Sequence, residues 1–311
     1  MFDSNNKQIL DELAAMGAPP IHAMAPADAR RGDLILAAAC QGNNPHEQVG
    51  RVEDRTIPGP AGEIPIRIYT PKAGAPCGAL VFFHGGGWVV GSIEGHDEVC
   101  RRLTNDSGAM VISVGYRLAP EHKFPAGLED SYAATAWVAA NAAALSYPAG
   151  RMAVGGDSAG GNLSAAISLM ARDRGGPKIA LQVLIYPAVS ASLDWPSVRE
   201  FDGYFVAVDD MKWFMNHYLR GPEDATNPYA YPLNAKDFRS LPPALVITAE
   251  MDPLRDQGEA YAARLRAAGV PTTLSRYEGV THAFVNMAPR VEAGRRAIRE
   301  AGAAIRAAFA R

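Results

Sequence analysis

The sequence predicts an α/β fold, with a mostly parallel, eight-stranded sheet flanked by helices and a helical cap over one edge. Three observations lead to this prediction. Eight short segments have strand character, and runs of helical character separate the later ones. One interval between strands, of roughly 55 residues, is far longer than an ordinary connection. Strands that alternate with helices form βαβ units, which place the strands in parallel and the helices on both faces.

The composition is that of a globular protein that holds its core without disulfides. The chain has 311 residues, of which 48% are hydrophobic, and a net charge of −3 without a basic run, which argues against nucleic-acid binding. Met1–Leu10 is polar where a signal peptide is apolar, and no apolar run approaches the ~18 residues of a membrane span. Cys40, Cys77 and Cys100 are widely spaced and fit reduced thiols. We therefore expect a cytoplasmic protein without a membrane span.

Two helices are expected before the first strand. The segment Ser4–Met16 has an amphipathic pattern, and a second helix is expected from about Ala27 to Ala39. Because both precede every strand, we expect residues 1–45 to be an addition to the sheet and to form the N-terminal part of the cap.

The strands fall into an antiparallel pair and a parallel set. Val49–Ile57 and Ile64–Tyr69 are joined by a link rich in Pro and Gly, so we expect them to form a hairpin. Ala79–Phe83 is a continuous apolar run, which is typical of a strand buried on both faces. The other expected strands are Met110–Val114, Met152–Gly155, Ala180–Ile185, Ala244–Ala249 and Thr272–Tyr277.

Helical patterns separate these strands, with one exception. The clearest are Asp97–Asn105, Ala126–Asn141, Ala159–Arg174, Asp256–Ala268 and Ala288–Ala308. The exception is the interval from Tyr186 to Pro243, which contains an aromatic helix, Asp209–Leu219. An insertion after a strand folds over the carboxyl edge of the sheet, where ligands bind in open α/β sheets. We expect residues 187–228 to complete the cap and residues 46–186 and 229–311 to form the main domain.

The pattern G-x-S-x-G occurs from Gly156 to Gly160, between a strand and a helix. A strand that turns at once into a helix brings backbone against backbone, so the flanking positions favour residues without a Cβ. Ser158 is then held strained and exposed at the N-terminus of a helix, whose dipole favours negative charge. A passive Gly-rich turn would fit this pattern equally well. A nucleophilic serine also needs a base, an acid and donors for an oxyanion.

The segment His84-Gly85-Gly86-Gly87 directly follows the third expected strand. Three glycines let the backbone approach a ligand and turn its N–H groups outward, as in the H-G-G-G element of lipases and esterases. We expect this segment and the N–H of Ala159 to supply the oxyanion donors, each worth about 3 kcal/mol. A plain tight turn is the alternative, and the position upstream of G-x-S-x-G favours the donors.

Three carboxylates near the seventh strand are candidates for the acid. Asp252 lies directly after the strand and is favoured. Asp256 falls where the next helix begins and fits a first-turn or N-cap carboxylate, while Glu250 lies closer to the strand. The base is expected to be His282, in the segment past the last strand. The chain order Ser…Asp…His is that of α/β-hydrolases.

Together these motifs resemble the hormone-sensitive-lipase-like family of bacterial carboxylesterases (bacterial family IV), within the α/β-hydrolase fold. The resemblance spans the chain from about residue 45 to the end. It rests on residues 83–88, 116–122, 156–162, 252–256 and 279–284. It implies a triad of Ser158, Asp252 and His282, an oxyanion hole of Gly85, Gly86 and Ala159, and a main domain that is catalytic. It also implies that strand 272–277 is a sheet edge that can pair across a homodimer.

The function expected from this site is hydrolysis of small-molecule esters through an acyl-enzyme, without a metal or an organic cofactor. Gly87, Trp88 and Asp157 are expected to contact the substrate. Bulky cap residues are expected to restrict it to short-acyl or compact esters: Tyr204, Phe205, Met211, Trp213 and Phe214. An amidase, lactonase or peptidase with the same triad is one alternative. A non-catalytic small-molecule-binding homologue is another, although such a chain would be expected to lose a triad member.

Overall fold

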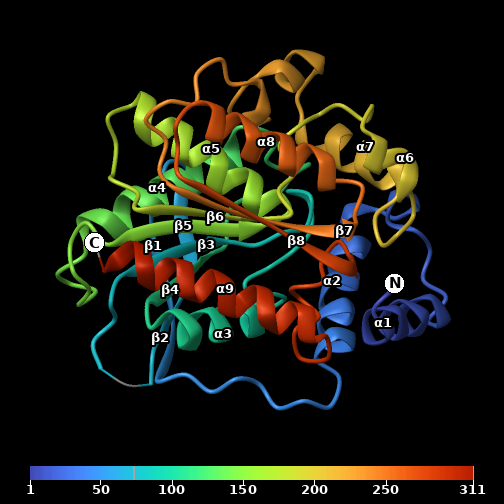
Figure 1. The fold of residues 1–311 in the computed structure, drawn as a ribbon, viewed down its shortest axis with the longest axis horizontal. Coiled ribbons are helices and arrows are strands. Elements are labelled where there is room, and N and C mark those ends of the chain that lie inside the picture. The colour runs from blue at the N-terminus through green and yellow to red at the C-terminus, as the bar shows by residue number, and fades with distance from the viewer. Residues whose placement is uncertain (73, 311) are drawn as a thin grey trace.

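The computed structural model describes residues 1–72 and 74–310, which form one eight-stranded sheet with helices on both faces (Figure 1). The strand order is β1-β2-β4-β3-β5-β6-β7-β8. Strand β2 pairs antiparallel with β1 and β4, and every other pair is parallel. The predicted fold class and the antiparallel hairpin are therefore confirmed.

The strands agree closely with their predicted positions. They are β1 (Arg51–Gly59), β2 (Gly62–Thr70), β3 (Ala79–Phe83), β4 (Met110–Val114), β5 (Met152–Asp157), β6 (Leu181–Ile185), β7 (Ala244–Met251) and β8 (Thr272–Thr281). Every residue of β3, β4, β5 and β6 is buried, as the continuous apolar runs predicted. Strands β5 and β8 run further than predicted, so each ends one residue before a candidate site residue, Ser158 and His282.

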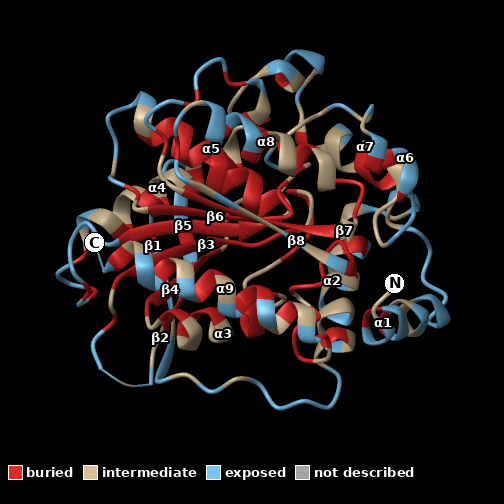
Figure 2. Cartoon of the chain, in the orientation of Figure 1, coloured by how far each residue is buried: buried red, intermediate tan, exposed pale blue. Residues whose placement is uncertain are grey.

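Two layers of helices cover the sheet (Figures 1 and 2). Helices α3 (Asp97–Ser107) and α9 (Glu292–Phe309) contact each other on one face. Helices α4 (Ala126–Ala140), α5 (Ala159–Asp173) and α8 (Arg255–Ala267) lie on the other. The inner side of α9 is apolar because Ile298, Ala301, Ile305 and Phe309 recur every three or four residues.

The start of α9 differs from the prediction. The apolar pattern predicted a helix from Ala288, but residues 282–290 form turns and the helix begins at Glu292. Pro289 explains the difference, because it lacks an N–H and disfavours the helical region for the residue before it. The turns after β8 belong to the segment that carries His282.

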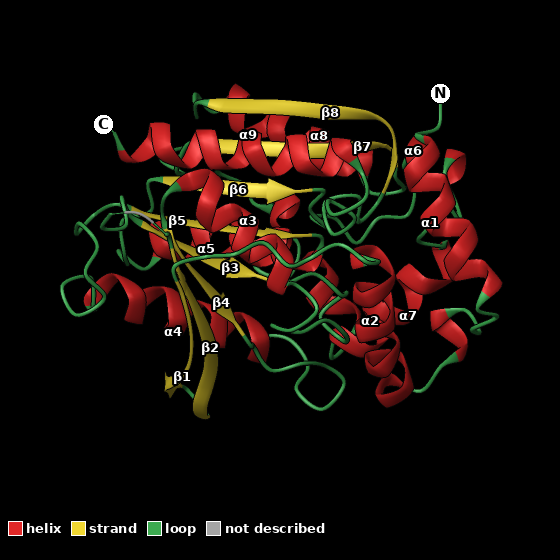
Figure 3. Cartoon of the chain, turned by 90° about the horizontal axis from the view of Figure 1, so that it is seen from below, coloured by secondary structure: helices red, strands yellow, loops and turns green. Residues whose placement is uncertain are grey.

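The remaining helices gather at the carboxyl end of the parallel strands (Figure 3). They are α1 (Ser4–Ala15), the 3-10 helix η1 (Ile21–Ala23), α2 (Pro26–Gln41), α6 (Pro196–Glu200) and α7 (Val208–Tyr218). Two short 3-10 helices, η2 (Pro222–Thr226) and η3 (Pro232–Asn234), lead on to β7. The N-terminal part contacts α7 through η1, where Nδ1 of His22 lies 2.7 Å from Oδ1 of Asp210. The predicted boundaries of the cap stay a prediction.

None of the helices found across residues 1–72 and 74–310 combines the length and the apolar character that crossing a bilayer requires.

Candidate active site

Ser158 sits in a sharp turn between β5 and α5. Its φ of 54° and ψ of −115° lie in a region that non-glycine residues rarely adopt. A side chain at Gly156 or Gly160 would overlap the carbonyl oxygen of Phe83, so β3 leaves no space there for a Cβ. The glycines of G-x-S-x-G are thus required by the close packing of this turn against β3. The turn places the Ser158 side chain at the N-terminus of α5.

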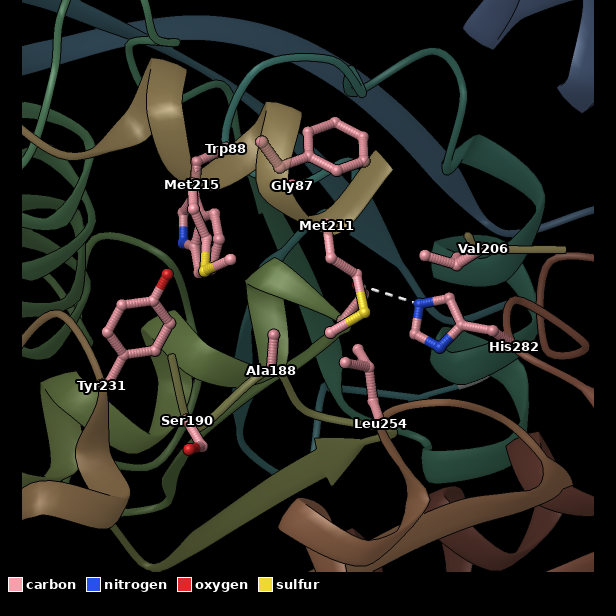
Figure 4. A pocket seen from close by; sticks show the side chains of 12 residues that line it. Gly87, Trp88, Ala188, Ser190, Val206, Met211, Met215, Tyr231, Leu254 and His282 are labelled. Atoms are coloured by element: carbon pink, nitrogen blue, oxygen red, sulfur yellow. Dashed lines mark hydrogen bonds between the residues drawn. The ribbon is translucent and has the colours of Figure 1, made fainter. Parts of the chain in front are cut away.

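The structure brings Ser158, His282 and Asp252 together at the carboxyl edge of the sheet. Nε2 of His282 lies 2.9 Å from Oγ of Ser158, the contact that Figure 4 marks with a dashed line. Nδ1 of His282 lies 2.7 Å from Oδ2 of Asp252. Asp252 is fully buried, and its other oxygen accepts a hydrogen bond from the Leu254 N–H at 2.8 Å. The imidazole therefore lies between a hydroxyl and a buried carboxylate, the arrangement that activates a serine.

The two competing carboxylates are engaged elsewhere. Glu250 accepts a hydrogen bond from the Gly279 N–H at 2.6 Å. Asp256 lies in the first turn of α8, as predicted, but the N-cap interpretation is wrong, because Leu254 occupies the N-cap. The Asp256 carboxylate instead accepts from the N–H of Ser197, at the start of α6.

The glycine loop after β3 requires one correction to the predicted oxyanion donors. The Gly85 N–H donates to Oδ1 of Asp157 at 2.9 Å, so this group is already used within the protein. Gly86 and Gly87 line the cavity beside Ser158, with φ values of 109° and 56°. Ala159 is the first residue of α5, where backbone N–H groups have no partner within the helix. The geometry therefore replaces Gly85 by Gly87 in the candidate donor set.

Asp157 was predicted to contact the substrate, but its carboxylate holds the glycine loop. It is 2% exposed and also lies 3.1 Å from Nε2 of His96, which is 4% exposed. Burial lowers the pKa of His96, but the charge and hydrogen bond of Asp157 outweigh it, so that pKa is raised. Burial raises the pKa of Asp157, and His96 with the Gly85 N–H outweighs it, so that pKa is lowered. This buried pair positions the loop. Asp157 also lines the wide cavity beside Ser158, so its contact with the substrate stays a prediction.

The His96–Asp157 pair predicts a pH-dependent contribution to stability. Because the folded pKa of His96 is raised, its contribution to the free energy of unfolding is fully present below about pH 6.5. That contribution is lost as the pH rises through the folded pKa. Because the folded pKa of Asp157 is lowered, its contribution to the free energy of unfolding is present above about pH 4. That contribution is lost as the pH falls through the folded pKa. Asp33 and His84 are the other titratable groups that face His96.

His96→Gln is therefore expected to lower the free energy of unfolding by about 3 kcal/mol between those limits, because it leaves a buried carboxylate unpaired. The difference from wild type should shrink as the pH rises above the folded pKa of His96. Urea unfolding at a series of pH values measures it, with His46→Gln as the control, since His46 pairs with Glu98 near the surface. A deficit of the same size at every pH would contradict this account.

The cavity beside Ser158 has two lobes, which meet at this residue. The narrow lobe has a volume of about 60 Å³ and the wide lobe about 450 Å³. Both are lined by Gly87, Ser158, Val206, Phe214 and His282. The narrow lobe adds Trp88, Ala188, Ser190, Met211, Met215, Tyr231 and Leu254 (Figure 4). The wide lobe adds, among others, Asp33, Leu36, Phe205, Ala283 and Asn286. Ser158 thus lies between a small apolar compartment and a larger one with polar groups.

The bulky cap residues that the sequence singled out divide between cavity and packing. Phe205, Met211 and Phe214 line the lobes. Tyr204 is 41% exposed, and Trp213 packs edge-on against Phe214. Sequence reasoning missed Met215, one helical turn after Met211, and Tyr231, which lies beyond the aromatic helix. The spacing of the two methionines on α7 was the available signal, and Tyr231 had none.

The N-terminal helix contacts the segment that carries His282, which no sequence signal indicated. Asn6 is fully buried, and its Oδ1 accepts from the N–H of Thr281 at 2.8 Å. The Asp3 N–H also donates to the Gly279 carbonyl at 2.8 Å. Helix α1 therefore supports the end of β8 directly before His282.

Among residues 1–72 and 74–310, no three His, Cys, Asp or Glu side chains are grouped so as to hold a metal ion.

The fold and the site together define a class. A mostly parallel eight-stranded sheet, with a serine in a strand–turn–helix and a histidine after the last strand, is characteristic of the α/β-hydrolase fold. The sequence profile of a family described by the alpha/beta hydrolase fold matches residues 80–286.

Known proteins define the family more closely. The chain is 46% identical over 243 residues to the carboxylic ester hydrolase LipN of Mycobacterium tuberculosis, a match that spans 76% of this chain and 65% of that protein. It is 42% identical over 268 residues to the carboxylesterase NlhH of the same organism, across 83% of each. A solved hyperthermophilic esterase from the archaeon Pyrobaculum calidifontis superposes with a TM-score of 0.91, at 48% identity and 98% coverage of both chains. The chain belongs to the hormone-sensitive-lipase-like carboxylesterases of the α/β-hydrolase fold and is a carboxylic ester hydrolase.

Proposed function

We propose that this protein hydrolyses small-molecule esters with short or compact acyl groups, using Ser158 as nucleophile, His282 as base and Asp252 as its partner. The observation that carries the proposal is the continuous contact from Ser158 through His282 to Asp252, with distances of 2.9 and 2.7 Å. These contacts also weigh against a non-catalytic binding homologue, in which the arrangement would have no use.

The geometry supports hydrolysis through an acyl-enzyme. His282 accepts the Ser158 proton as Oγ attacks the ester carbonyl, and Asp252 stabilises the resulting imidazolium. The backbone N–H groups of Gly86, Gly87 and Ala159 are the proposed donors to the oxyanion. His282 then gives its proton to the departing alcohol. In the second half, His282 takes a proton from the water that attacks the acyl carbonyl, and it then gives this proton to Oγ of Ser158 as the acid leaves.

The two lobes divide the substrate at the scissile bond. Ala283 and Asn286, close to His282 in the chain, line the wide lobe. The departing alcohol must face His282, which protonates it. His282 lines both lobes, but only the wide lobe is also lined by its neighbours in the chain, so we assign the wide lobe to the alcohol. The acyl group then occupies the narrow lobe. Its volume of about 60 Å³ leaves room for roughly four water-sized groups.

The acyl-length profile tests this assignment. We expect kcat/KM to rise from acetyl to butyryl or hexanoyl esters and to fall beyond, since each methylene that fits contributes about 0.8 kcal/mol. A longer chain has to displace the side chains of Met211 and Met215. The measurement is a series of esters of one alcohol with graded acyl length, together with the matched anilide. Efficiency still rising at dodecanoyl, or an anilide cleaved faster than its ester, would contradict the proposal.

Two further parts of the proposal concern the whole molecule. Strand β8 lies at an edge of the sheet, so its outer backbone groups can pair with a second copy in a homodimer. Sedimentation velocity distinguishes a dimer from a monomer.

The three cysteines are free, which supports a cytoplasmic location. Cell fractionation tests that location.

A further inference from the structure

Asp33, on α2, is a carboxylate in the wall of the wide lobe whose hydrogen bonding is incomplete. Its Oδ2 accepts one hydrogen bond, from the Ser92 hydroxyl at 3.3 Å. Its Oδ1 has no partner among the described residues, and it is not one of the unpaired atoms that the protein encloses completely. The residue lies where the wide lobe meets a second cavity of about 300 Å³. Oδ1 is therefore accessible to a molecule in this space.

The other two carboxylates of the wide lobe are already paired within the protein. Asp157 holds the glycine loop and lies 3.1 Å from Nε2 of His96. Asp210 lies 2.7 Å from Nδ1 of His22 and accepts a hydrogen bond from the backbone at the start of α7. Among the three carboxylates, Asp33 is thus the one with bonding capacity left for a ligand.

The wall of the wide lobe carries more negative than positive charge. Its described lining includes three carboxylates and no Lys or Arg, and its basic groups are His96 and His282. Burial raises the pKa of Asp33, and the charge of His96 offsets this in part. The same imidazole is paired with Asp157, and one positive charge cannot neutralise two carboxylates. The wide lobe is therefore a place where a cation is favoured and an anion is disfavoured.

Two aromatic rings line the same lobe close to the reacting groups. The centroid of the Phe205 ring lies 6.5 Å from that of His282. The Phe214 ring fills the space that a side chain at Gly87 would need. The faces of aromatic rings attract cations, and quaternary ammonium groups are bound in this way. An ammonium group in the wide lobe would thus have a carboxylate and two rings available to it.

We propose that the wide lobe selects esters whose alcohol carries a positive charge, and that Asp33 is the residue that recognises the cation. The substrate class is esters of short acids with amino alcohols. This inference rests on the proposed function, because that function assigns the alcohol to the wide lobe. It adds the charge of the alcohol to the selection by acyl length.

Butyrylcholine and 3,3-dimethylbutyl butyrate form the test pair, because a trimethylammonium group and a tert-butyl group have the same shape and differ in charge. The kcat/KM of each ester is measured at pH 8, well above the ordinary pKa of a carboxyl group. Each value is divided by the rate constant of hydroxide-catalysed hydrolysis, which corrects for the reactivity of the ester itself. We expect the charged ester to be preferred by about tenfold, since opposite charges attract strongly in a partly buried site.

A second pair places the charge on the acyl side. It consists of the trimethylammonioacetyl and 3,3-dimethylbutanoyl esters of one alcohol, treated in the same way. Because the lining of the narrow lobe is largely apolar, we expect the charged acyl group to be the poorer substrate of this pair.

Two variants separate recognition by Asp33 from a general effect of negative charge. Asp33→Asn removes the charge with almost no change in volume and should reduce the normalised preference for butyrylcholine to about one. Glu94 lines the second cavity, outside the wide lobe, and pairs with Arg67 at 2.8 Å. Glu94→Gln removes an equal charge and should keep the preference. The wild-type ratio needs no variant, so the proposal stays testable even if one of them fails to fold.

Four results would overturn the inference. They are no preference for butyrylcholine, a preference that survives Asp33→Asn, an equal loss in both variants, and a preference for the charged acyl group instead. In each of these cases, hydrolysis of the neutral esters keeps the proposed function intact. Neutral-ester hydrolysis that does not depend on Ser158 would instead remove the proposed function itself.

Discussion

Replacing Ser158 with alanine is expected to lower kcat by roughly 10⁴–10⁶-fold and to leave the fold intact. The substitution removes the atom that attacks the ester and keeps the backbone of the turn, whose glycines pack against β3. What remains is the rate that the oxyanion donors and substrate positioning supply without a nucleophile. Steady-state hydrolysis of a butyryl ester measures the loss, and the thermal unfolding midpoint checks the fold.

A second serine on the same helix provides the matched control. Ser168 is buried in α5, and its hydroxyl donates to the Ser164 carbonyl at 2.8 Å. Ser168→Ala removes a hydroxyl with no contact to His282, so we expect activity within about threefold of wild type. A Ser158→Ala enzyme within tenfold of wild type would be incompatible with the mechanism.

Asp252→Asn is expected to lower kcat by about 10⁴-fold. One Asp252 oxygen accepts from the Leu254 N–H and the other faces Nδ1 of His282. In the variant, the amide oxygen keeps the bond to Leu254, so the amide NH₂ faces Nδ1. His282 must then carry its proton on Nε2, where it cannot accept the proton of Ser158. The substitution changes a hydrogen-bonding pattern with almost no change in volume.

The neighbouring carboxylate tests whether the acid is correctly chosen. Asp256 has similar charge and lies four residues away, but it accepts from the Ser197 N–H at the start of α6. Asp256→Asn should therefore reduce kcat by less than about tenfold, through a looser α6. Measuring both variants on one ester decides the matter, and a larger loss at Asp256 than at Asp252 would reverse the assignment.

The sequence predicted the sheet and the central contacts of the site because their determinants are local. Buried strands are continuous apolar runs, and a strand–turn–helix around Ser158 needs glycines at fixed spacing. His282 and Asp252 follow strands that end at the same edge, so chain order alone brought them near Ser158. Each of these inferences needs only a segment and its place in the order of strands.

The parts that escaped prediction depend on contacts between distant residues. The Gly85 N–H bonds to Asp157, 72 residues away, and this removed Gly85 from the predicted donors. The side chain of Asn6 accepts a hydrogen bond from the Thr281 N–H, 275 residues away in the chain, and no pattern in either segment predicts this contact. Tyr231 lies in a stretch without regular periodicity. Its position against Trp88 depends on the path of the irregular segment that connects α7 to β7.

The most direct test of the central claim is labelling with a p-nitrophenyl alkylphosphonate, followed by mass spectrometry of the digested protein. Oγ of Ser158 should displace p-nitrophenol from phosphorus, and His282 should assist by taking the proton. The account predicts one equivalent of phosphonate on Ser158, complete loss of ester hydrolysis, and no labelling of the Ser158→Ala variant. Label on another residue, or full labelling with hydrolysis undiminished, would contradict it.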